Sequence, residues 1–212
     1  MSEIYIPAGA GESELTEKRS RFLGHVRRVE SEDEARAFIG EMKKKYYDAR
    51  HNCWCYSIQD GPERYSDDGE PQGSAGIPML EVLRRRSVTN AVCVVTRYFG
   101  GVLLGTGGLL RAYSKSTADA LDAAGLAAVR SWTETALCCA YAQLERMKTE
   151  AVAAGGTVED IVYGAEVTLK VLVPAEEAER FAARIFDVSA GSVRVRVTGE
   201  SRRAVRIGGA AG

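Results

Sequence analysis

Residues 90–113, NAVCVVTRYFGGVLLGTGGLLRAY, decide the fold of the first half of the chain. Residues 90–99 form a nearly continuous apolar run, which is typical of a central strand covered on both faces. The run ends at a glycine-rich bend, and a helical pattern follows until Gly125, a residue suited to the left-handed conformation that closes a helix. The positions at helical spacing are Leu110, Tyr113, Thr117, Leu121 and Ala124.

The segments before this unit alternate between strand and helix patterns. Ser31 and Glu34 form a capping-box signature, so a helix is expected to begin just after Ser31. Gly, Pro, Asp and Ser dominate residues 60–76, which predicts a long loop of the kind that carries function. The expected elements are a strand or hairpin at 13–29, a helix at 32–47, a strand at 51–59, the loop at 60–76 and a short helix at 77–86.

The second half of the chain has a different order of elements. From about Leu137 it shows a strand, a helix at 143–154, two strands joined near Tyr163, a helix at 175–187 and a final strand. This β-α-β-β-α-β order matches a ferredoxin-like domain. We therefore predict an α+β protein with two domains, 1–134 and 135–212.

Composition limits the classes of function. The chain has 212 residues, 45% of them hydrophobic and 27% charged, as in a globular protein, and its net charge of −1 provides no global basic field for nucleic acid. No window approaches a membrane span and the first residues do not resemble a signal peptide, so a cytoplasmic location is expected. The odd number of cysteines and the lack of a C-x-x-C pair predict reduced packing residues rather than disulfides.

The glycine-rich bend is the first candidate site. Backbone N–H groups freed of side chains, together with a helix N-terminus, can hold a phosphate or carboxylate. The alternative is that the glycines only permit a sharp turn and close packing. A P-loop is disfavoured because its lysine is missing, and a Rossmann motif because Leu110 replaces the third glycine. The candidate ligand-binding residues are Arg97, Gly100, Gly101, Gly105, Thr106, Gly107, Gly108 and Arg111.

An acidic loop is the second candidate site. Asp67, Asp68 and Glu70 place three carboxylates within four residues. They could bind a divalent ion, form a turn by accepting backbone N–H bonds while Ser74 caps the next helix, or pair with Arg97 or Arg111. All three interpretations are compatible with the sequence.

Histidines and cysteines offer weaker candidates. Neither histidine has an evident Ser or Cys partner, and no G-x-S-x-G elbow occurs. His51, at the start of a predicted strand, is the better candidate for a site residue, whereas His25 lies in an ordinary strand. A zinc site from His51, Cys53 and Cys55 is disfavoured because their alternating spacing is unusual for zinc. No catalytic residue is identified, and no cofactor or metal is expected.

Three segments closely resemble the signature of the YigZ/Impact family. They are DARHNC at 48–53, YSDDGEPQGSAGIPML at 65–80 and VVTRYFGGVLLGTGGLLRAY at 94–113. The resemblance spans essentially the whole chain and implies an N-terminal Impact domain folded as an α/β sandwich, like domain 2 of a small-subunit ribosomal protein. It also implies a C-terminal domain like the last domain of elongation factor G. Asn52, where many relatives have a second histidine, and residues 114–116, where relatives are richer in glycine, depart from the pattern.

Two functions follow as hypotheses. The first is a non-catalytic protein of translation regulation that binds RNA, the ribosome or a protein partner, with the glycine bend as its anion site. The second is a metal-assisted hydrolase or transferase acting on a small phosphorylated substrate, with the acidic loop as its base or metal site. In a third interpretation both loops are purely architectural. Eukaryotic relatives regulate translation through a partner that controls a stress kinase, but that contact does not transfer to this chain.

Overall fold

The computed structural model describes residues 4–206 and shows an α+β protein with two sheets and five α-helices in that part of the chain. The described residues divide into two compact units: one is Arg130–Arg203, and the other contains residues 4–129 together with residues 204–206. The boundary expected after residue 134 falls inside strand β7 (Leu126–Cys139). The first part of β7 pairs with β1 (Ile4–Pro7) and the rest pairs with β9 (Val167–Pro174).

The first unit is built on a five-stranded sheet. Neighbouring strands are antiparallel, and the order is β2 (Gly11–Glu17), β3 (Ser20–Arg28), β6 (Ala91–Tyr98), β4 (His51–Ser57) and β5 (Glu63–Ser66). The predicted central strand is thereby confirmed as β6. The hairpin expected within 13–29 is also confirmed, with Lys18 and Arg19 both at positive φ in its turn.

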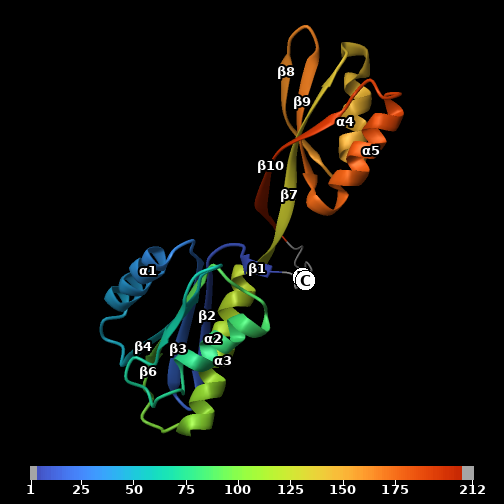
Figure 1. Ribbon diagram of the computed structural model, residues 1–212. Coiled ribbons are helices and arrows are strands. Elements are labelled where there is room, and N and C mark those ends of the chain that lie inside the picture. The colour runs from blue at the N-terminus through green and yellow to red at the C-terminus, as the bar shows by residue number, and fades with distance from the viewer. Residues whose placement is uncertain (1–3, 207–212) are drawn as a thin grey trace. The chain divides into compact units, whose positions relative to one another are not determined.

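Helices cover both faces of this sheet (Figure 1). Helix α1 (Glu32–Lys45) packs on one face, and helices α2 (Gly76–Arg85) and α3 (Gly105–Ala124) pack on the other. Successive residues of β6 alternate between the two cores: Cys93 lies with α2 and α3, whereas Val94 lies with α1. Burial on both sides explains why the strand has no polar face.

Several boundaries differ from the predictions. The 60–76 loop contains strand β5, and α3 begins at Gly105, so the second half of the glycine-rich bend is helix. Strand β1 and the start of β7 were not predicted. Residues 126–136 of β7 are mostly small or polar and lack a clear strand pattern, so this part of the strand is stabilised by its pairing partners. The strand expected from residue 137 ends at Cys139, where a 3-10 turn follows.

The second unit has the predicted β-α-β-β-α-β order. Its elements after β7 are α4 (Leu144–Ala153), β8 (Thr157–Tyr163), β9, α5 (Ala178–Val188) and β10 (Val195–Arg206). The strand order β8-β9-β7-β10 is that of a ferredoxin-like sheet. Met147 of α4 and Phe181 of α5 are buried in one core with Leu169 of β9, so both helices pack on the sheet.

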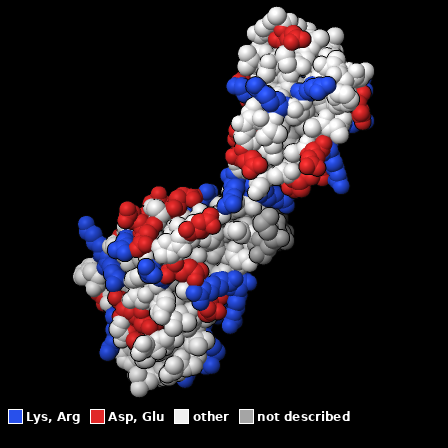
Figure 2. Space-filling view, in the orientation of Figure 1, with Lys and Arg blue, Asp and Glu red and all other residues white. Residues whose placement is uncertain are grey.

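Basic and acidic side chains are interspersed on the face of each unit seen in Figure 2. Such mixing agrees with the net charge of −1 and limits any attraction for a polyanion to local groups. No helix of residues 4–206 combines the length and hydropathy that a membrane span requires.

Candidate functional site

A pocket of about 410 Å³ lies in the first unit where β4, the 67–75 loop, the end of β6 and the start of α3 meet. It brings together residues from both candidate sites. The residues that line it and carry polar or aromatic groups are Arg50, His51, Glu70, Arg97, Phe99 and Thr106. Arg50 and Phe99 were not predicted.

The N-terminus of α3 supplies free hydrogen-bond donors to this pocket. Gly105 and Thr106 line it, and Gly105, Thr106 and Gly107 are exposed. The N-cap, Leu104, provides no side-chain cap, and the first turn holds no acidic residue. Because the first N–H groups of a helix lack intrahelical partners and sit at the positive end of its dipole, this end can receive an anion.

The first glycines of the bend have a different role. The N–H of Gly100 donates to the Ser20 hydroxyl at 3.2 Å, and a Cβ at this position would come within 2.0 Å of the Arg19 backbone. Gly101 adopts φ of +82°, a conformation that favours glycine. The bend therefore combines close packing at Gly100 and a tight turn at Gly101 with open amides from Gly105 onward.

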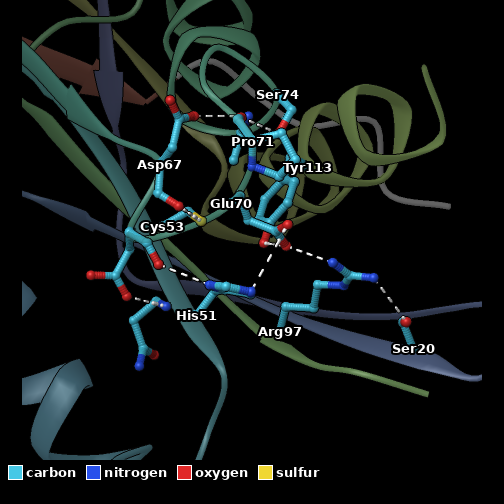
Figure 3. A network of polar contacts seen from close by, with 12 residues as sticks. Ser20, His51, Cys53, Asp67, Glu70, Pro71, Ser74, Arg97 and Tyr113 are labelled. Atoms are coloured by element: carbon cyan, nitrogen blue, oxygen red, sulfur yellow. Dashed lines mark hydrogen bonds and ion pairs between the residues drawn. The ribbon is translucent and has the colours of Figure 1, made fainter. Parts of the chain in front are cut away.

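A buried ion pair forms part of the pocket wall, and its contacts are drawn in Figure 3. Arg97 Nη1 donates to Glu70 Oε1 at 2.7 Å, and the side chains are only 6% and 3% exposed, respectively. The Tyr113 hydroxyl donates to the same oxygen at 2.8 Å. Burial raises the pKa of Tyr113, and the neighbouring Glu70 acts in the same direction. The pairing of Glu70 with Arg97 is one of the three interpretations offered for the acidic loop.

Arg97 also connects this pair to the neighbouring strand. Its Nη2 donates to Ser20 Oγ at 3.3 Å, so it bridges β6 and β3. Its Nε is buried and has no hydrogen-bond partner in the described part of the chain. Its guanidinium carbon lies 5.5 Å from the centre of the Phe99 ring, and that of Arg50 lies at the same distance from this ring.

Asp67 organises the loop rather than facing the pocket. Its Oδ1 accepts N–H bonds from Ala75 at 3.0 Å and Gly76 at 2.8 Å, and its Oδ2 accepts one from Gly73 at 2.8 Å. The predicted turn formed by an aspartate is thus present. The prediction that Ser74 caps the next helix is wrong, because its hydroxyl donates to the Pro71 carbonyl and Asp67 takes the capping role.

Asp68 ties the loop to two other elements. Its Oδ1 pairs with Lys43 of α1 at 2.6 Å, and its Oδ2 accepts the N–H of Asn52 at 2.7 Å. The three carboxylates of the loop therefore have three separate sets of donors. Within residues 4–206 no group of three or more His, Cys, Asp or Glu side chains is arranged to hold a metal ion.

His51 lies in the pocket beside Glu70. Its Nδ1 is 2.8 Å from the carbonyl oxygen of Asp68, and its Nε2 is 4.0 Å from Glu70 Oε2. Asn52 lies on the opposite face of β4, where its Oδ1 accepts from Thr96 and its Nδ2 donates to the Tyr46 carbonyl. Because neighbouring strand residues point to opposite faces, a histidine at position 52 would not share the pocket with His51.

Arg111 lines a separate hollow, together with Glu17 and Lys115. It does not line the first pocket, but its Nη1 would lie 3.6 Å from a Cβ at Gly107, so its guanidinium lies beside the exposed first turn of α3. The second arginine of the pocket is instead Arg50, in the DARHNC segment quoted above. That segment is one of the three that carry the family resemblance, but its position in the sequence does not indicate that Arg50 lies beside the glycine bend.

The cysteines of the first unit are packing residues. Cys53, Cys55 and Cys93 are buried and unpaired, and burial raises the pKa of all three, that of Cys93 to about 12. Cys53 donates its thiol hydrogen to the Asp67 carbonyl at 3.0 Å. These thiols stay protonated at neutral pH, and thiolate is the form that binds metals and attacks substrates.

Comparison with known proteins identifies both parts of the chain. Residues 18–121 match the Impact N-terminal domain, and residues 137–192 match a Domain of unknown function (DUF1949). IMPACT family member YvyE of Bacillus subtilis (strain 168) is 38% identical over 86% of this chain and 85% of its own. IMPACT family member YigZ of Escherichia coli (strain K12) is 36% identical over 84% of this chain and 89% of its own.

A solved structure supports the same relationship. The protein, described as "Crystal structure of an hypothetical protein", is 34% identical to this chain with a TM-score of 0.58. The match covers 94% of this chain and 98% of the other. With both domain matches and these relatives in agreement, the chain belongs to the YigZ/Impact family.

Proposed function

We propose that the chain is a cytoplasmic, non-catalytic binding protein of RNA biology, connected with translation, and that its pocket takes a phosphate group of single-stranded RNA, including exposed ribosomal RNA. One observation carries this proposal: the uncapped N-terminus of α3 opens into the same pocket as Arg50, Arg97 and Phe99. Backbone amides, a guanidinium group and an aromatic ring are the groups that proteins use for single-stranded nucleic acid.

The groups that line the pocket have different roles in the proposed binding. The amides from Gly105 onward and the Thr106 hydroxyl can donate to phosphate oxygens. Arg50 is exposed and brings a positive charge to the pocket, whereas the charge of Arg97 is already balanced by Glu70. Phe99 is 38% exposed and presents surface on which a base can stack. Binding should therefore be local, modest in strength and dependent on salt.

The metal-assisted alternative has less support. Asp67, Asp68 and Glu70 are engaged by separate donors, as described above, so recruiting them to one ion would break hydrogen bonds in three places. A general base drawn from this loop would have to come from the same engaged groups. No observation in the described residues favours this reaction over simple binding.

The substitution Thr106→Glu tests the proposal. A carboxylate about 5 Å from a phosphate costs about 3 kcal/mol at an effective dielectric constant of about 20. Half of that is enough to weaken RNA binding about tenfold. The same carboxylate in the first turn of α3 should stabilise the folded protein by about 0.3–1 kcal/mol. Thr106→Glu is therefore expected to weaken RNA binding and to raise the free energy of unfolding.

Fluorescence anisotropy with a labelled RNA hexamer, measured from 20 to 200 mM salt, provides the readout. Thr106→Gln is the matched control, because it has nearly the same shape without the charge. Arg50→Gln should lower the salt slope by about one. Salt-independent binding, or equal affinities for the Glu and Gln variants, would refute the proposed site.

A further inference from the structure

The two oxygens of the buried Glu70 carboxylate have different surroundings. Oε1 accepts hydrogen bonds from both the Arg97 guanidinium and the Tyr113 hydroxyl. Oε2 receives no hydrogen bond from any described residue, and its nearest polar neighbour is His51 Nε2 at 4.0 Å. The side chain is 3% exposed and lines the pocket, so Oε2 is an acceptor with unused capacity that can be reached from the pocket.

The partner of His51 determines which of its ring nitrogens carries hydrogen. Nδ1 lies 2.8 Å from the Asp68 carbonyl oxygen, which can only accept. Nδ1 therefore carries the hydrogen, and in the neutral ring Nε2 has a free lone pair. In the described part of the chain Nε2 makes no hydrogen bond, and the ring lines the pocket.

Two unfilled acceptors thus face the same space. Their separation of 4.0 Å is too long for a direct hydrogen bond but lets one atom lie within hydrogen-bonding distance of both. A hydroxyl has a single hydrogen and can satisfy only one of them as a donor. An amino group has two hydrogens and can donate to both. Figure 3 shows the His51 ring and the Glu70 carboxylate that would accept them.

We propose that Glu70 Oε2 and His51 Nε2 together receive an amino group of the ligand. In RNA this group is the exocyclic amine of adenine, cytosine or guanine, and uracil lacks it. The inference rests on the proposed function, because the α3 N-terminus holds the phosphate of the same ligand. Phe99 lines the same pocket and offers its ring to the base. The pocket then discriminates among bases as well as binding the backbone.

Pairs of RNA hexamers that differ in the amine test this inference with the unmodified chain. Oligoadenosine is compared with the hexamer of purine riboside, which has the same ring system without the amine, and oligocytidine is compared with oligouridine. Affinities are measured by fluorescence anisotropy at 50 mM salt. We expect the amine-bearing member of each pair to bind at least about tenfold more tightly, since the other covers a charged acceptor without giving it a donor.

The variant Glu70→Gln should change the preference for bases that carry an amine. The amide oxygen must face the donors Arg97 and Tyr113, so the new amide nitrogen takes the place of Oε2 and becomes a donor. The preference for oligocytidine over oligouridine should then disappear or reverse. Tyr113→Phe is the matched control: it removes a hydrogen bond to the same carboxylate, on Oε1, and should leave the preference intact.

The outcomes separate this inference from the proposed function. Salt-dependent binding that is equal within each pair overturns the amine site and leaves the phosphate site standing. Absence of salt-dependent binding to every hexamer overturns both. If Glu70→Gln does not fold, the comparison of the two pairs on the unmodified chain decides alone, and a retained preference in a folded Glu70→Gln variant also overturns the amine site.

Discussion

Removing the Asp67 carboxylate should strongly destabilise the first unit. Helix α2 begins at Gly76 without a local side-chain cap and without an acidic residue in its first turn. Asp67, from the start of the loop, supplies the missing cap by accepting the N–H groups of Ala75 and Gly76, and it accepts a third from Gly73. Asp67→Ala removes all three bonds at once.

These contacts determine how much the free energy of unfolding falls in Asp67→Ala. Ala75 and Gly76 are buried, so water cannot readily replace the lost acceptor. Each unsatisfied buried donor costs about 1–3 kcal/mol, and bonds to a charged acceptor are at the upper end. Allowing for partial relaxation, Asp67→Ala should lower the free energy of unfolding by about 3–5 kcal/mol. Asp67→Asn keeps an oxygen for α2 but loses the charge, and should cost about 1–2 kcal/mol.

Urea unfolding followed by tryptophan fluorescence measures the effect. The chain has two tryptophans, so a Trp132→Phe background leaves only Trp54, which lies in β4 of the first unit. Asp68→Asn is the matched control. It weakens a partly exposed pair with Lys43 and one backbone bond, and should cost only about 1 kcal/mol.

Two results would refute this reasoning. One is a loss below about 1 kcal/mol for Asp67→Ala, since a remote cap with three bonds cannot be that weak. The other is stabilisation of the parent by magnesium that Asp67→Ala abolishes, because this would show that the carboxylate binds a metal ion.

Three further predictions concern other parts of the molecule. Gly11→Ala should destabilise the protein by several kcal/mol in urea unfolding, because the new Cβ would lie 2.0 Å from the Ala120 carbonyl oxygen. In contrast, the new Cβ of Gly40→Ala in α1 meets no atom within 4 Å, so this substitution should stabilise the protein by about 0.5–1 kcal/mol. Burial lowers the pKa of His25 below 6.5, so the unfolded chain takes up its proton first and stability should fall as pH drops from about 6.5, a slope that His25→Gln should reduce. A thiol reagent should label one cysteine quickly in the folded protein, and Cys138→Ser should abolish that phase, because Cys138 is exposed and the other four are buried.

Elements with a strong local pattern could be predicted from the sequence. The apolar run that became β6, the helix ending at Gly125 and the β-α-β-β-α-β order of the second half all appeared at nearly the observed positions. Their signals lie in residues close together in the chain, such as side chains at intervals of two or of three to four residues. Strand β1 lacked such a signal, since its four residues are held by pairing with β7, more than a hundred positions away.

In the acidic loop, the sequence does not determine which role each carboxylate takes. Its composition allowed metal binding, turn formation or pairing with arginine, and the structure uses the second for Asp67 and the third for Glu70. The partners of these carboxylates lie from 6 to 43 residues away, and only folding brings them together. Neighbouring residues of identical charge consequently have different roles.

The amino-acid sequence by itself determined the order of strands and helices, the α+β class, the family and the existence of a glycine-rich bend, because each depends on residue types at short, regular spacing. Tertiary structure alone decided that Gly100 packs against the Arg19 backbone while Gly105 opens into a pocket, and that Arg50 rather than Arg111 lines it. It also placed His51 Nε2 opposite Glu70 Oε2. The physical reason is that a side chain's exposure and partners depend on the packing of strands distant in the sequence, and local spacing carries no record of that packing.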